Sequence, residues 1–231
     1  MKKTETKKIL FNQLKPFFES KGYQLVISKY SGFIKRFDSG RDWIYFDAYD
    51  FNPCQNIHYS VMKNIILIDE IWQIIDERYF NVERLNLEFA HTLKFSYESL
   101  NSLNKSSYLP DIREEKDVLI NTDMIIEFIS CIALPMLERF NDIREIDKEI
   151  NGDIFWESDW RKPFQVGNFP FHRLIIAFLC GNKNFEQLYH YHNGLFDYSN
   201  KEYPVKIING KNSIEYLRAI LEESGKWNTA S

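Results

Sequence analysis

Residues 33–63 read FIKRFDSGRDWIYFDAYDFNPCQNIHYSVMK, a run rich in aromatic and β-branched residues that two turn sequences interrupt. Such runs, when bounded by glycine, proline or asparagine, are typical of β-strands. Connections of only three or four residues place neighbouring strands antiparallel to each other. The predicted strands in this run cover residues 33–38, 43–52 and 56–63.

The residues that precede this run follow a helical pattern. Leu10 and Leu14 lie on one face of a helix, and Gly22 is suited to ending it. Pro16 interrupts the pattern, because a proline inside a helix removes a hydrogen bond and costs about 3 kcal/mol. We therefore expect either a kink or a late helix start. A further strand is predicted at residues 23–29, between this helix and the others.

Beyond the sheet the pattern becomes mainly helical. Residues 71–79 have helical spacing, and apolar and polar residues alternate at 93–97, which predicts a fifth strand. Polar and charged residues gather at 101–121, where we expect a loop or linker. A helix over 122–137 is apolar on almost all sides. It is expected to be central to the core, with the thiol of Cys131 buried and unreactive.

The last third of the sequence predicts more helices and one short strand. Asn168, Asn184 and Ser213 are suited to capping helices, and Gly181 fits the end of the first of them. Residues 203–208 have the composition of a short strand.

Together these elements predict an α+β fold with an N-terminal helix, an antiparallel sheet of about five strands and a helical C-terminal half. A division is expected near residue 110. Residues 1–110 would hold the first helix and the sheet, and residues 111–231 a mainly helical region. That region would form either a separate domain or one domain with the sheet on which it packs.

The composition excludes several classes of protein. The chain has 231 residues, a net charge of −4, 16% aromatic residues and three cysteines. These figures exclude collagen-like, disulfide-rich and strongly basic nucleic-acid-binding chains. Cys54, Cys131 and Cys180 are expected to be free thiols. The N-terminus lacks the apolar segment of a signal peptide, and no apolar run approaches the roughly 18 residues of a membrane span. We therefore expect a cytoplasmic protein without membrane or nucleic-acid partners.

Familiar catalytic and ligand-binding motifs are missing from the sequence. It contains no GxSxG elbow, P-loop, GxGxxG turn, HExxH or paired CxxC. His190 follows Glu186 by four residues, which suits an exposed ion pair, and His192 falls on the apolar face of the same predicted helix. We therefore predict no cofactor and no metal site, and we favour a protein that is not an enzyme.

One face of the predicted strand 43–52 is a candidate binding site. The alternation of a strand places Trp43, Tyr45, Asp47 and Tyr49 on this face and the intervening apolar residues on the core face. Two interpretations remain open: a helix covers the aromatic face, or the face is an open groove that stacks a ligand or a partner. The carboxylate needs a partner if it is buried, since an unpaired buried charge is costly.

Basic residues in two places bear on this site. Arg36, on the neighbouring predicted strand, is an available cation for the carboxylate. Lys2, Lys3, Lys7 and Lys8 are expected instead to solvate the outer face of the first helix, because the chain is net acidic and lacks a basic stripe.

A second candidate site lies in a predicted loop. Trp156, Glu157, Asp159, Trp160 and Arg161 have the composition of an interface hot spot, in which tryptophan and arginine are enriched. The alternative is that both tryptophans attach the loop to the core.

The N-terminal residues resemble a known group of proteins. Phe11, Leu14-Lys15-Pro16, Gly22-Tyr23 and Phe33-Ile34-Lys35-Arg36 are similar to the start of bacterial α+β domains of unknown function. In those domains a helix ending in glycine and an aromatic residue enters an antiparallel sheet. Some are encoded beside polymorphic toxins and are thought to act as immunity proteins. The resemblance covers residues 5–98 and implies no catalytic residues.

The sequence thus predicts a cytoplasmic, non-enzymatic protein that binds another protein, with the resemblance implying a toxin-neutralising partner of the immunity type. The alternative is a small-molecule binding protein or an atypical hydrolase that uses the aromatic and acidic sheet face. The sequence leaves the oligomeric state open.

Overall fold

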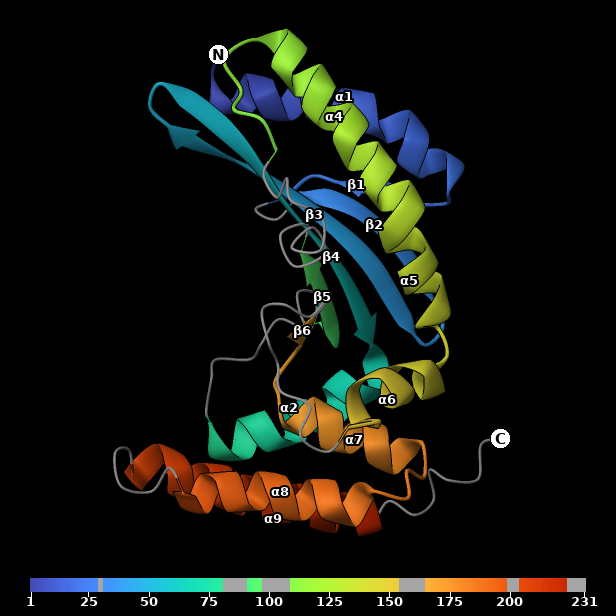
Figure 1. Cartoon of the computed structure of the whole chain (residues 1–231), viewed down its shortest axis with the longest axis vertical. Helices are drawn as coiled ribbons and strands as arrows, with labels where there is room; N and C mark the ends of the chain where they lie inside the picture. The colour runs from blue at the N-terminus through green and yellow to red at the C-terminus, as the bar shows by residue number, and fades with distance from the viewer. Residues whose placement is uncertain (29–30, 81–90, 97–108, 154–164, 199–203, 224–231) are drawn as a thin grey trace. The chain divides into compact units, whose positions relative to one another are not determined.

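The computed structural model divides the chain into two compact units (Figure 1). It describes residues 1–28, 31–80, 91–96, 109–153, 165–198 and 204–223. The first unit, here called the sheet unit, comprises residues 1–64, 93–139 and 159–165. The second, here called the helical unit, comprises residues 65–92, 140–158 and 166–231. Each unit takes segments from both sides of residue 110.

The chain begins with a helix, and the strands of an antiparallel sheet follow it. Helix α1 covers Lys3–Ser20. The six strands follow one another in the sheet in sequence order, from β1 to β6. Their bounds are Gln24–Val26 (β1), Gly32–Phe37 (β2), Gly40–Phe51 (β3), Cys54–Ile65 (β4), Leu93–Ser96 (β5) and Gln165–Val166 (β6). The α+β prediction is confirmed, with one short strand more than expected.

The pairing of β2 with β3 ends well before β3 does. The two strands pair from Phe37 opposite Gly40 to Gly32 opposite Tyr45. One more backbone bond, from the Phe46 N–H to the Ser31 carbonyl, measures 3.0 Å. Residues 47–51 of β3 therefore extend past the end of β2.

The core of the sheet unit lies between one face of the sheet and α1. The Phe18 ring stacks on Phe33 with 4.2 Å between ring centroids, and Phe11 meets Phe46 edge to face at 6.1 Å. These contacts also explain why α1 runs unbroken past Pro16 from a start at Lys3. Burial of the apolar face offsets the hydrogen bond that proline removes, so the expected late start is wrong.

A second long helix packs beside α1 on the same face of the sheet (Figure 1). It consists of α4 (Glu115–Phe128), a π-helical turn (Ile129–Ala133) and α5 (Leu134–Arg139). Its start lies seven residues before position 122, at a capping box in which Asp117 accepts the Glu114 N–H at 3.0 Å.

Only one side of this second helix is buried. Val118, Ile125 and Ile129 face the core, whereas Ile120 is 49% exposed and Cys131 is also exposed. The prediction of a core helix buried on all sides, with a buried thiol at Cys131, is therefore wrong. The physical reason is that α1 and the sheet cover a single side of the helix. Among the described residues, 115–139 form a helix long and apolar enough to span a membrane by length and composition alone, and 39% of its most apolar window is buried in the protein.

The exposure of the three free cysteines predicts their order of reaction with a thiol reagent. Cys131 is exposed, whereas Cys54 and Cys180 are half-buried. Burial also raises the pKa of Cys180 to about 12, which leaves almost no thiolate at neutral pH. We expect iodoacetamide at pH 7.5 to modify Cys131 first and Cys180 last, as measured by peptide mass spectrometry. The Cys131→Ser variant should lose the fast phase, and a fast phase that persists in this variant would contradict the assignment.

The helical unit contains five described helices, which are α2 (Ile66–Tyr79), α6 (Ile143–Asn151), α7 (Phe171–Leu179), α8 (Phe185–Tyr198) and α9 (Pro204–Glu223). Trp72 of α2 packs on Phe171 of α7 with 4.7 Å between ring centroids. Gly181 ends α7 in the left-handed region at φ +61°, as predicted. The expected strand at 203–208 is wrong, because α9 begins at Pro204, and proline suits the first turn of a helix.

Candidate functional site

The structure places the four predicted residues of β3 in one continuous row. Trp43 and Tyr45 lie with 6.3 Å between ring centroids, and the Tyr45 hydroxyl interacts with both Asp47 and Tyr49. Phe51 continues the same alternation. We call these five residues the β3 outer row. Ile44, Phe46 and Ala48, the apolar residues between them, are fully buried, as the predicted division of the two faces requires.

Exposure rises along the β3 outer row toward the turn that joins β3 to β4. Trp43 is 6% exposed, Tyr49 44% and Phe51 58%. His58 of β4 packs against Tyr49 with 6.1 Å between ring centroids. One end of the row is therefore buried and the other is exposed.

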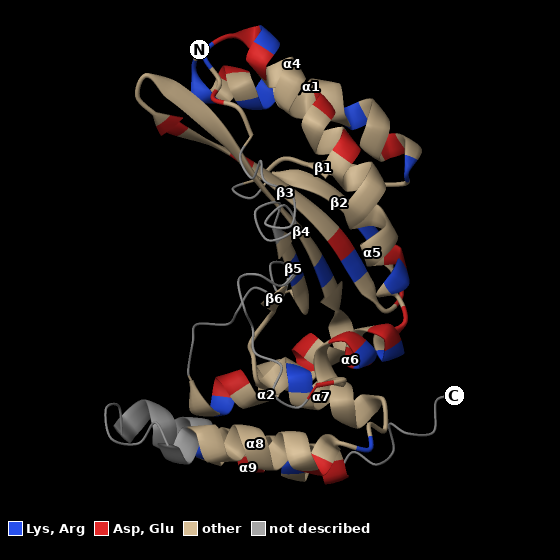
Figure 2. Cartoon of the chain, viewed as in Figure 1, with Lys and Arg blue, Asp and Glu red and all other residues tan. Residues whose placement is uncertain are grey.

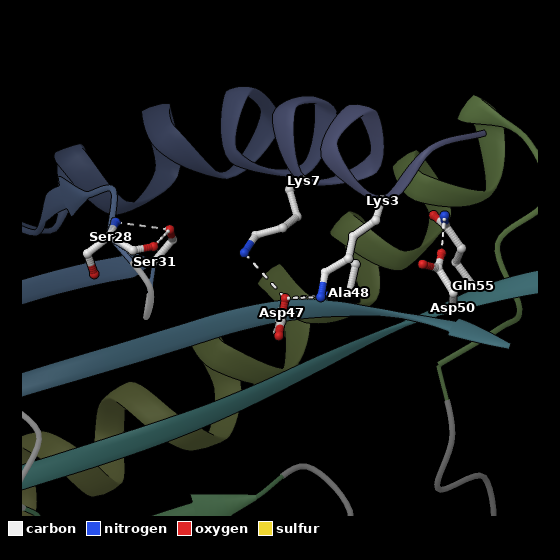
Figure 3. Close-up of polar contacts among 8 residues, drawn as sticks. All are labelled: Lys3, Lys7, Ser28, Ser31, Asp47, Ala48, Asp50 and Gln55. Atoms are coloured by element: carbon white, nitrogen blue, oxygen red, sulfur yellow. Dashed lines mark hydrogen bonds and ion pairs between the residues drawn. The ribbon is translucent and has the colours of Figure 1, made fainter.

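Asp47 lies at the centre of a polar cluster (Figure 3). Its Oδ1 atom is 3.1 Å from the Lys3 Nζ and 3.3 Å from the Lys7 Nζ, and it accepts the Ala48 N–H at 2.8 Å. The Lys3 ammonium also lies 5.3 Å from the centroid of the Tyr49 ring. The carboxylate is thus paired, as its position requires.

The sequence pattern predicted a different position for the lysine side chains of this cluster. Lys3 and Lys7 were expected to face solvent, and Arg36 was named as an available cation for Asp47. Figure 2 shows basic residues at the start of α1. Figure 3 shows the Lys3 and Lys7 side chains extending from α1 to Asp47 of β3. Arg36 instead lies opposite Arg41 in the β2–β3 ladder and is exposed. A spacing of four along α1 is the signal that Lys3 and Lys7 share one helix face.

The charges of the cluster shift two pKa values. Burial alone would raise the pKa of Asp47, but the hydrogen bond from Lys3, the Ala48 amide and the Lys7 charge together lower it. The carboxylate is therefore ionised at neutral pH. Burial, followed by the nearby Asp47 charge and the Tyr49 hydroxyl, raises the pKa of Tyr45, so its hydroxyl stays protonated and is able to donate a hydrogen bond.

A second polar group in the sheet unit is buried beneath the helices. The Lys63 Nζ is 2.7 Å from the Asp42 Oδ1, and the Tyr23 hydroxyl lies 3.5 Å from the other carboxylate oxygen. The Lys63 side chain is 0% exposed, and the Phe37 ring centroid lies 4.6 Å from its ammonium. Burial raises the pKa of Asp42 and lowers that of Lys63, in each case against the attraction of the partner. The sequence signal was a charged residue at a core-facing position of each strand.

The helical unit contains a buried carboxylate beside a histidine. The Asp69 Oδ1 of α2 lies 3.3 Å from the His172 Nε2 of α7, and both side chains are almost fully buried. The Thr92 hydroxyl accepts the Ile65 N–H at 2.8 Å and lies 3.5 Å from the Asp69 carboxylate. Burial, with a smaller effect of His91, lowers the pKa of His172 to about 3.

A second buried network in this unit is built on Arg173. Its Nε donates to the Asn151 Oδ1 at 2.8 Å, a second nitrogen donates to the Asp153 carbonyl, and a third lies 3.4 Å from the His192 Nε2. His192 is 0% exposed, so its predicted core position is confirmed. Burial, followed by the Arg173 charge, lowers the pKa of His192 to about 3. His190 is exposed, with its Nε2 4.0 Å from Glu186, as the spacing predicted.

The second predicted site, Trp156, Glu157, Asp159, Trp160 and Arg161, lies outside the described residues. Within the described residues, no three or more His, Cys, Asp and Glu side chains form a group that could hold a metal ion. Comparisons with protein-family models, with curated proteins and with solved structures find no match for this chain.

Proposed function

We propose that this chain is a cytoplasmic, non-enzymatic protein that binds another protein, and that its partner is a toxin which it neutralises. The exposed end of the β3 outer row, Tyr49 and Phe51, is the proposed contact surface. The observation that carries this proposal is the exposure of two large aromatic side chains on adjacent outward positions of one strand. Aromatic residues are enriched at protein interfaces, where they supply most of the binding energy.

The surroundings of these two residues also favour a protein partner. The Lys3 ammonium lies over the Tyr49 ring, so a charged group borders the aromatic pair. An apolar centre with a polar border is the usual anatomy of a protein interface. Both aromatic residues lie on a β-strand that continues into the core. Because the backbone of this strand is already ordered, little of its conformational entropy is lost on binding.

The same contacts weigh against the alternative of a small-molecule site on this face. Trp43 is buried, the Tyr45 hydroxyl interacts with Asp47 and Tyr49, and two lysines hold the Asp47 carboxylate. The polar groups that would orient a ligand are therefore already used within the protein.

The proposal is tested by capture of the partner from the native host, followed by calorimetry with the purified partner. Tyr49→Ala and Phe51→Ala are each expected to weaken binding by roughly 30-fold, which corresponds to the 2 kcal/mol of an interface hot spot. Growth of cells that co-express the captured partner shows whether that partner is toxic and whether this chain neutralises it.

The matched control for this experiment is Ile27→Ala, which removes another exposed apolar side chain of the sheet unit, 69% exposed, at the end of β1. It should bind as the unmodified chain does. Equal affinity of both aromatic variants would contradict the proposed surface. A loss of binding only in the Trp156→Ala and Trp160→Ala variants would assign the contact to residues 156–161 instead.

A further inference from the structure

Among the described residues, no strand pairs with the distal part of β3 on the side toward β2. On the side toward β2, the ladder ends with the bond from the Phe46 N–H to the Ser31 carbonyl. Backbone groups of alternate residues point to the same side of a strand, so Ala48 and Asp50 would make the next bonds on this side. No described strand pairs with them there. Unpaired edges of this kind accept additional strands from other chains.

Asp47 closes this edge in the free protein. Its carboxylate accepts the Ala48 N–H at 2.8 Å, in the place where the carbonyl of an added strand would lie (Figure 3). Ala48 is 0% exposed although it lies on an edge, and the Lys3 and Lys7 side chains bind the same oxygen of Asp47. A charged side chain and lysines are common protection for an edge strand.

Breaking the contacts of Asp47 that close this edge costs little free energy. The Lys3 and Lys7 side chains are 39% and 22% exposed, and ion pairs with this much solvent contact contribute only about 0–1 kcal/mol each. The bond to the Ala48 amide contributes about 1 kcal/mol. An added strand would replace that bond with a backbone carbonyl and gain further bonds at Asp50, so the exchange is favourable when the strand also contacts Tyr49 and Phe51.

We propose that the edge of β3 from Ala48 to Phe51 is a gated site for strand addition, and that its occupant is an extended segment of the protein partner that carries a carboxylate. This inference rests on the proposed function and specifies its binding mode. Lys3 and Lys7 converge on one anion, and that anion is Asp47 in the free protein. A carboxylate of the partner takes its place while the partner's backbone pairs with Ala48 and Asp50. Main-chain bonds then supply affinity, and the exposed aromatic pair supplies specificity.

The test uses amide NMR spectra of the full chain with three acetylated eight-residue peptides. The peptides share an alternating Val and Thr frame and differ only in two central positions, which hold Glu, Gln or Lys. The acidic peptide should shift the amide signals of Ala48 and Asp50 and slow their exchange with solvent. It should bind roughly tenfold more tightly to the Asp47→Asn variant, in which the lysines lose their internal anion. Replacing both Lys3 and Lys7 with alanine should remove the preference for Glu over Gln.

Three results would overturn the proposal. The first is that none of the three peptides shifts the amide signals of Ala48 and Asp50 in the Asp47→Asn variant. The second is equal affinity for the Glu and Lys peptides. The third is that the Asp47→Asn variant pairs with a second copy of itself in preference to the peptide. The failure of strand addition is distinguishable from the failure of the proposed function. If the captured partner depends on Tyr49 and Phe51 but does not protect the Ala48 amide, the binding surface stands and the binding mode is wrong.

Discussion

Replacing Asp42 with alanine is expected to destabilise the chain by about 3–5 kcal/mol, because the variant leaves the Lys63 ammonium buried without its counter-charge. The Lys63 side chain is 0% exposed and lies 2.7 Å from the Asp42 carboxylate. Urea unfolding of the full chain, followed by circular dichroism, measures the effect.

Three further variants make this expectation specific. The double variant Asp42→Leu with Lys63→Met removes both charges and keeps similar volumes, so it should recover most of the lost stability. Glu19→Ala breaks the exposed pair that Lys15 and Glu19 form at 3.7 Å, and it should change stability by less than about 0.5 kcal/mol. If Asp42→Ala does not fold at all, Asp42→Asn provides a milder loss of the charge. A double variant no more stable than Asp42→Ala would contradict the role of the unpaired charge.

Acidification from pH 7 to pH 5 is expected to cost the helical unit about 4 kcal/mol of stability. His172 and His192 are fully buried, and burial lowers the pKa of each to about 3. In the unfolded chain both have a pKa of about 6.5. Below pH 6.5 the unfolded state therefore binds two protons that the folded state does not, and each histidine costs about 1.4 kcal/mol per pH unit until the pH approaches 3. The loss is absent above pH 7.

The measurement is the free energy of unfolding in urea at several pH values. His192→Gln should remove about half of the pH dependence, because it leaves a single buried histidine to titrate. His190→Gln is the matched control, since the His190 side chain is 73% exposed. A stability that stays flat between pH 7 and pH 5 would contradict the prediction. A loss of only about half that size, which His192→Gln then abolishes, would mean that the Asp69 carboxylate, 3.3 Å from the His172 Nε2, keeps that imidazole protonated in the folded protein.

Much of the sheet unit could be predicted from local patterns. The strands of residues 33–63 were placed to within three residues, because turn residues mark their ends and aromatic residues dominate between them. The assignment of Phe46 to the core and of Tyr49 to the opposite face followed from the alternation of a strand. Helix starts were less predictable. The capping box at Glu114 and Asp117 lies within a charged segment that resembles a loop in composition.

The polar parts of the structure depend on pairings that no local pattern contains. Lys3 and Asp47 are 44 positions apart, and Asp42 and Lys63 are 21 apart, yet each pair lies within 3.1 Å. The sequence indicated that Asp47 needs a partner but not which cation supplies it. Likewise, the apolar composition of residues 122–137 predicted burial on all sides, whereas α1 and the sheet cover only one side of that helix.

Side-chain periodicity and turn chemistry act over a few residues, and they are enough to predict the α+β class, the order of most elements and the two faces of β3. Packing between distant segments, in contrast, determines which end of the β3 outer row is exposed. Trp43 is covered and Tyr49 is exposed although both occupy the same face of one strand. The surroundings of Ala48 also depend on tertiary structure, because the described part of β2 ends before β3 does and α1 brings two lysines to Asp47. Exposure depends on which distant segments pack on a residue, and that is a property of the whole fold.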